Sequence, residues 1–108
     1  MSAFNLNNIF PSPAYYRSSP VSDQRLTVDD TSGGVQFAAF GDTTNMIVLD
    51  VQDADVMVTF DTSAPTTTNG HRLYAGSHFT WSKATAAAAK FIRQGGANAA
   101  IHASEFQL

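Results

Sequence analysis

The chain contains no cysteine, few charged residues and no long apolar run, and each absence excludes a class of protein. Without cysteine there is no disulfide framework, no thiolate zinc site and no cysteine nucleophile. Only 14% of the 108 residues are charged, and the 6 lysines and arginines are scattered from Arg17 to Arg93. Nucleic-acid binding requires clustered basic side chains, so this composition argues against it. No stretch reaches the roughly 18 apolar residues of a membrane-spanning helix.

The chain, with 108 residues, is long enough for one domain and too short for two domains. Hydrophobic residues make up 44% of it, which is enough for a packed core, and the net charge is -3. The first ten residues lack the positive charge and the continuous apolar run of a signal peptide. We therefore expect a protein of the cytoplasm or of a particle assembled there.

Residues 1–22 differ in composition from the rest of the chain. Three of the 4 prolines lie in this segment, and proline disfavours helix at the residue before it. The segment also carries large apolar side chains that an ordinary flexible linker lacks: Phe4, Leu6, Ile9, Phe10, Tyr15 and Tyr16. Their burial supplies roughly 9–18 kcal/mol, whereas ordering the backbone costs roughly 1–2 kcal/mol per residue.

The sequence therefore predicts an extended N-terminal arm over residues 1–22 and a single β-rich domain over residues 23–108. Side-chain burial alone does not order such an arm, so it needs hydrogen bonds to another segment. Two sources are open, its own domain or a neighbouring molecule, and disorder is the third alternative.

Short apolar runs separated by turn residues follow the arm, and this pattern is typical of β-strands. The two runs 46–51 and 55–61 are joined by Gln52-Asp53-Ala54 and predict a β-hairpin. Residues 63–70 combine proline, threonines and Asn-Gly, and predict a loop. Further strands are predicted at 26–28, 35–40, 71–74, 79–81 and 99–106.

One stretch, from Lys83 to about Arg93, has the apolar spacing of a helix. Ser82 is a suitable N-cap, and Gly95-Gly96 ends the helical pattern. The fold class predicted for the chain is mainly β: a small antiparallel β-sandwich or barrel with one short α-helix and an extended N-terminal arm.

The residues that could carry chemistry do not form a recognisable motif. His71, His78 and His102 lack the close spacing of a zinc site. The aspartates do not follow a calcium-loop pattern, and they suit turns and strand ends as well: Asp29, Asp30, Asp50, Asp53, Asp55 and Asp61. The glycines at 33–34 are not followed by the lysine of a phosphate loop.

No nucleophile elbow is present either, so we expect no catalytic residue, no cofactor and no metal. Phe79, Trp81 and Tyr74 could form a stacking platform for a sugar or a base. Aromatic residues at this spacing more often belong partly to the core and partly to an interface.

Residues 45–106 contain a series of motifs that resembles a known family. Val58-Thr59-Phe60-Asp61 is followed by Ser63-Ala64-Pro65-Thr66 and then by Asn69-Gly70. Phe79-Thr80-Trp81-Ser82 precedes the segment Ala88-Ala89-Lys90-Phe91-Ile92-Arg93. In these motifs the chain resembles small β-rich virion structural proteins of tailed bacteriophages. The resemblance does not include the N-terminal arm.

The resemblance implies a capsid decoration (cement) protein that stabilises contacts between major capsid subunits in the virion. Its partners would be the major capsid protein or other virion proteins, with further copies of itself as a homo-oligomer. The arm residues would make the contacts, so deletion of residues 1–20 should abolish particle binding. One alternative is a head-to-tail joining or tail component that forms a ring. A second is a carbohydrate- or cell-surface-binding module that uses Trp81 and Tyr74.

Overall fold

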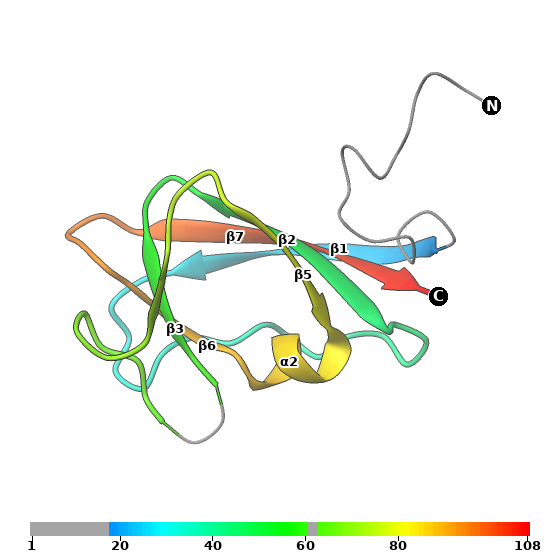
Figure 1. Cartoon of the computed structure of the whole chain (residues 1–108), viewed down its shortest axis with the longest axis horizontal. Helices are drawn as coiled ribbons and strands as arrows, with labels where there is room; N and C mark the ends of the chain where they lie inside the picture. Colours follow the sequence, from blue (N-terminus) through cyan, green and yellow to red (C-terminus); the bar gives the residue numbers. More distant parts are fainter. Residues whose placement is uncertain (1–17, 61–62) are drawn as a thin grey trace.

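Two antiparallel β-sheets and one short helix make up the computed structural model, which describes residues 18–60 and 63–108 (Figure 1). The strands are β1 (Ser19–Val28), β2 (Met46–Gln52), β3 (Val56–Thr59), β4 (His71–Leu73), β5 (His78–Ser82), β6 (Lys90–Arg93) and β7 (Ala99–Gln107), and the helix is α2 (Lys83–Ala88). The prediction of a mainly β protein with one short helix is confirmed. Within residues 18–60 and 63–108, the structure contains no helix with the length and apolar character of a membrane-spanning segment.

The larger sheet has the strand order β1-β7-β2-β5, and the smaller one has the order β4-β3-β6. In the larger sheet, successive side chains of each strand point to opposite faces. Ile47 and Leu49 of β2 and Ile101 of β7 are fully buried and face the smaller sheet. Their neighbours in sequence, such as Asp50 and His102, lie on the opposite face, which we call the outer face of the larger sheet.

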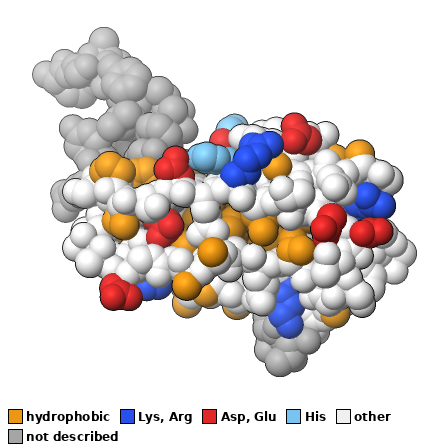
Figure 2. Space-filling model, turned by 180° about the vertical axis from the view of Figure 1, so that it is seen from behind, with side chains coloured by type: hydrophobic (Ala, Val, Ile, Leu, Met, Phe, Trp, Pro, Cys, Tyr) orange, Lys and Arg blue, Asp and Glu red, His pale blue; other side chains and the backbone are white. Residues whose placement is uncertain are grey.

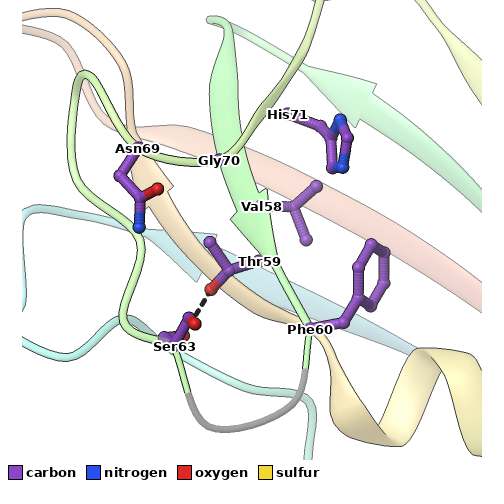
Figure 3. Close-up of a pocket in the computed structure, with 7 residues that line it drawn as sticks. All are labelled: Val58, Thr59, Phe60, Ser63, Asn69, Gly70 and His71. Carbon is purple, nitrogen blue, oxygen red and sulfur yellow. Dashed lines mark hydrogen bonds between the residues drawn. The ribbon is translucent and has the colours of Figure 1, made fainter.

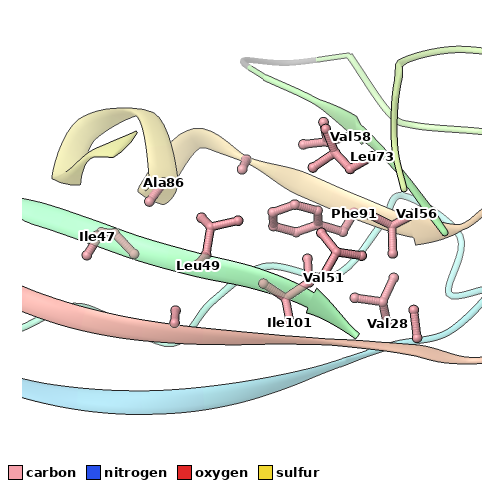
Figure 4. Close-up of a cluster of buried hydrophobic side chains, with 13 residues drawn as sticks. Val28, Ile47, Leu49, Val51, Val56, Val58, Leu73, Ala86, Phe91 and Ile101 are labelled. Atoms are coloured by element: carbon pink, nitrogen blue, oxygen red, sulfur yellow. The ribbon is translucent and has the colours of Figure 1, made fainter. Parts of the chain in front are cut away.

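The core lies between the two sheets, with Phe91 of β6 in its middle (Figure 4). The ring of Phe91 is 5.5 Å from that of Phe37 in an edge-on contact and 6.3 Å from that of Trp81 in a stacked contact. Trp81 in turn touches Phe60 and Phe79 at ring distances of 5.4 and 5.9 Å. A continuous chain of aromatic rings therefore runs through the interior of the sandwich.

The predicted hairpin between residues 46–51 and 55–61 is wrong. β2 pairs with β5 and β7 in the larger sheet, whereas β3 pairs with β4 and β6 in the smaller one. Asp53 lies between them with a φ of 74°, and the chain crosses there from one sheet to the other. The alternation of apolar residues indicates a strand, but it carries no information on which strand is its neighbour.

The predicted helix over residues 83–93 is correct for its first half only. Ser82 caps it as expected, since its side chain accepts from the Thr85 N–H, but the helix ends at Ala88. Ala89 is extended (φ -72°, ψ 133°), and the chain continues into β6. As a strand residue, Phe91 points into the core and pairs with Val58 of β3 and with Val35. These tertiary contacts outweigh the helical spacing of the alanines.

The strand predicted at residues 35–40 is reduced to a single bridge between Val35 and Phe91. The rest of this segment packs against the core and is held to β1 by Gln24. The Gln24 side-chain amide donates to the Ala38 carbonyl oxygen (3.2 Å) and accepts from the Ala38 N–H (3.0 Å). A glutamine side chain thus replaces the strand pairing that the sequence pattern suggested.

Candidate functional site

The residues predicted to bind a partner, Phe4, Leu6, Ile9, Phe10, Tyr15 and Tyr16, all lie outside the described residues. The description starts at Ser18, and β1 begins directly after it at Ser19. Residues 19–22, which the sequence assigned to the arm, are therefore the first part of β1 and pair with the end of β7. In the sequence, β1 therefore follows directly after the residues of the predicted arm.

β1 is an edge strand of the larger sheet and exposes most of its length. On its outer face, Asp23 lies 3.3 Å from the Nε2 atom of His102. Arg25 donates to the side-chain oxygens of Gln52 and Asp53 at 2.5 and 3.2 Å. Figure 2 shows the molecule from behind, with positive and negative side chains interspersed rather than separated by sign. Asp23 and Arg25 are thus paired with residues of β7 and of the end of β2 and the turn after it, and they remain exposed at the surface.

The three histidines do not come together. His78 pairs with Asp50 on the neighbouring strand β2 at 2.5 Å, and His102 pairs with Asp23. His71 lies in the other sheet, on β4. In the described part of the chain, no group of three or more histidine, aspartate or glutamate side chains could hold a metal ion.

The aspartates act in turns and surface ion pairs. Asp29 accepts from the N–H and hydroxyl of Thr31, and Asp30 lies 3.4 Å from Arg93. Asp55 accepts from Arg72 at 2.7 Å and from the Ala75 N–H at 2.8 Å, which holds the turn after β4 against the start of β3. These contacts fit the interpretation that the aspartates serve turns and strand ends. Asp61 lies outside the described residues.

The pKa of the Asp55 carboxyl is lowered from its ordinary value by the hydrogen bond from the Ala75 N–H and then by the bond from Arg72. A lowered pKa in the folded protein means that ionised Asp55 stabilises the fold above the pKa of the unfolded chain. This stabilisation is lost as the pH falls through the lower pKa of the folded state. The Thr31 hydroxyl and N–H lower the pKa of Asp29 in the same direction.

We therefore expect Asp55→Asn to reduce the loss of stability between neutral pH and about pH 3. The measurement is the urea midpoint of unfolding as a function of pH. Asp42→Asn is the matched control, because Asp42 is exposed and no side-chain partner for it is found in the described ranges. An acid dependence that is identical in Asp55→Asn and in the unsubstituted chain would contradict this assignment.

The aromatic residues proposed as a stacking platform are divided between the interior and the surface. Trp81 is partly buried and packs against Phe60, Phe79 and Phe91. Tyr74 is 60% exposed, and the guanidinium of Arg72 lies over its ring at 5.1 Å. Trp81 and Tyr74 are not in ring contact, so the geometry does not offer them as one flat surface.

A surface pocket of about 460 Å³ opens where β3 ends, between this strand and the loop 63–70 (Figure 3). Its polar side chains are used to shape the loop. The Thr59 hydroxyl donates to the Ser63 carbonyl oxygen (2.6 Å), and the Asn69 amide donates to the Ala64 carbonyl oxygen (3.1 Å). Gly70 has a φ of 132°, and a Cβ atom there would lie 2.8 Å from the Val58 carbonyl oxygen. Among the described residues that line the pocket, His71 is the one titratable side chain, so these residues contain no acid–base pair.

The exposed edge strand β1 is a candidate binding surface that the sequence analysis did not single out. The alternation Asp23-Gln24-Arg25 was the available signal, because it places opposite charges two residues apart on one face of a strand. Comparison with protein-family models, with curated proteins and with solved structures finds no match for the chain. The resemblance to phage virion proteins therefore stays a prediction from the motifs.

Proposed function

We propose that the protein is a non-catalytic structural component of a virus particle, and specifically a capsid decoration protein. The observation that carries the proposal is the position in the sequence of six large apolar side chains, within residues 4–16, shortly before the exposed edge strand β1. Among the described residues, several titratable side chains are used in surface pairs, such as Asp50–His78 and Asp55–Arg72. Within the described ranges, every buried side-chain nitrogen and oxygen has a partner.

An extended apolar segment binds a neighbour by adding a strand to a sheet edge or by lying in a groove between subunits. Each contact of this kind is weak, because the segment loses conformational entropy when it becomes ordered. A particle surface presents many equivalent sites, and cooperation between many copies compensates for the weakness of one. A small domain with low charge and an apolar arm suits this role.

Deletion of residues 1–17 is expected to abolish binding to capsids and to leave the domain folded. The deletion ends before Ser19, so it removes the arm and keeps all of β1, which a deletion of residues 1–20 would shorten. The measurement is co-sedimentation of the purified protein with capsids that lack it, together with circular dichroism of the truncated chain. Complete decoration by the truncated chain would contradict the proposal.

A pair of matched variants separates apolar contacts from the mere presence of the arm. Phe4→Ser, Ile9→Ser and Phe10→Ser combined are expected to lose binding, because they remove the apolar surface that would be buried. Asn5→Ala, Asn7→Ala and Asn8→Ala combined change as many residues in the same segment and should retain binding.

The number of copies per particle distinguishes a decoration protein from a head-to-tail joining ring. A joining ring contains about six or twelve copies, whereas a decoration protein contains hundreds.

A further inference from the structure

Among the described residues, β1 has the longest uncovered sheet edge. The edge strand β6 is covered by Val35, which exchanges two backbone hydrogen bonds with Phe91 (2.8 and 2.9 Å), and by Asp29, which accepts from the Arg93 N–H. The other two edge strands, β4 and β5, have 3 and 5 residues. β1 has 10 residues, and in the described ranges its only backbone pairing is with β7. Such an edge is a template for a further strand.

We propose that β1 pairs antiparallel with β1 of a second copy of this chain, around a two-fold axis at Gln24. The four-stranded sheets of the two copies then form one continuous sheet across the interface. A two-fold interface uses the same surface of both molecules, so β1 must be complementary to itself. The charge pattern of the strand meets this requirement in one register.

Asp23 and Arg25 lie on the outer face of the larger sheet, on either side of Gln24. With the axis at Gln24, Asp23 of each copy lies directly opposite Arg25 of the other, which gives two cross-strand ion pairs. With the axis at Asp23 two carboxylates would face each other, and with the axis at Arg25 two guanidinium groups would do so. Opposite charges in directly opposed positions stabilise a strand pair, and like charges destabilise it.

The remaining residues fit the same register. On the inner face, Ser22 lies opposite Leu26 of the second copy, so a small side chain faces a larger one. The central paired stretch is 22–26, and the β-bulge between Pro20 and Ser22 lies outside it. Pro20 has no N–H and cannot donate to a neighbouring strand. Because it lies outside residues 22–26, the paired stretch loses no hydrogen bond.

The side chains of Asp23 and Arg25 remain accessible to a second copy, although each already has a partner within its own chain. The side chains of Asp23 and Arg25 are 58% and 50% exposed in their pairs with His102 and Asp53. Surface pairs of this kind contribute little to stability, so sharing a partner with a second copy costs little. Because the inference concerns self-association through residues 22–26, its test is separate from the capsid-binding test of residues 1–17.

The test is sedimentation equilibrium of the full chain over a range of concentrations. We expect a species of twice the monomer mass of 11.6 kDa. Asp23→Arg and Arg25→Asp should each weaken the dimer by at least about tenfold, because each places like charges opposite one another. The double variant, with both substitutions, restores opposite charges and should restore the dimer. Asp42→Arg changes the net charge as Asp23→Arg does but lies outside β1, and it should have no effect.

The register is tested by disulfide formation, which the absence of native cysteine makes unambiguous. Oxidised Gln24→Cys should cross-link to itself across the axis, whereas Ser22→Cys should not, because its two copies are offset along the strands. A monomer at all concentrations would overturn the proposal. So would a dimer that both single charge reversals leave intact, or cross-linking by Ser22→Cys in preference to Gln24→Cys.

Discussion

Replacement of Phe91 with alanine is expected to lower the free energy of unfolding by about 3–5 kcal/mol. The side chain of Phe91 is fully buried between the two sheets. Its loss leaves a cavity bordered by Phe37 and Trp81, and neither ring can fill it without leaving its other aromatic neighbours. The cost therefore includes both the lost transfer of the ring from water and the cavity that remains.

The measurement is urea unfolding followed by the fluorescence of Trp81, the single tryptophan of the chain. Because Phe91 stacks on Trp81, the folded-state emission should also shift to longer wavelength. Ile92→Ala is the matched control on the same strand, since Ile92 points away from the core and is only partly buried. A loss of stability in Phe91→Ala no larger than in Ile92→Ala would contradict the central position of this ring.

The positions of most strands could be predicted because alternation of apolar residues is a local signal. The run at Met46–Val51 became β2, and the run at Ala99–Phe106 became β7 almost to the residue. The loop predicted at residues 63–70 likewise lies between β3 and β4, and the Thr66 N–H donates there to the Asn69 carbonyl oxygen at 3.0 Å. In each case the residues that fix the structure are close together in the chain.

Strand pairing and the end of the helix could not be predicted, because both depend on distant residues. β2 and β3 are separated by three residues, yet each has its partners elsewhere in the chain. The helical spacing continues through Phe91, but the β3 strand and Val35 are available to pair with it as a strand. Nothing in residues 83–93 themselves indicates that those partners exist.

The candidate site shows the same division. The sequence favoured turns and strand ends for the aspartates, and Asp29, Asp50 and Asp55 have contacts of this kind in the described ranges. The expectation of no metal and no catalytic residue stays a prediction. It did not indicate that β1 would be the edge of the sheet, because strand order is a property of the whole fold. The apolar arm residues remain a prediction of the sequence alone.

Glu105, the single glutamate of the chain, shows how a buried polar group fixes one end of the sandwich. It lies on β7, faces inward and is only 4% exposed. One carboxyl oxygen, Oε1, accepts from the Gly41 N–H at 2.8 Å and from the Thr44 hydroxyl at 2.9 Å. The same turn is closed by the Thr44 N–H, which donates to the Gly41 carbonyl oxygen at 3.1 Å. Glu105 therefore holds the turn that leads into β2.

Glu105→Ala is expected to lower the free energy of unfolding by about 2–4 kcal/mol, since it leaves two donors at the Gly41–Thr44 turn without their acceptor. Glu105→Gln is the matched control, because an amide oxygen in place of Oε1 can accept both bonds. We expect it to lower the free energy of unfolding by about 1 kcal/mol. Urea unfolding measures both values, and amide hydrogen exchange at Gly41 should accelerate in the alanine variant first. Equal losses in the two variants would mean that the negative charge, rather than the acceptor geometry, maintains the turn.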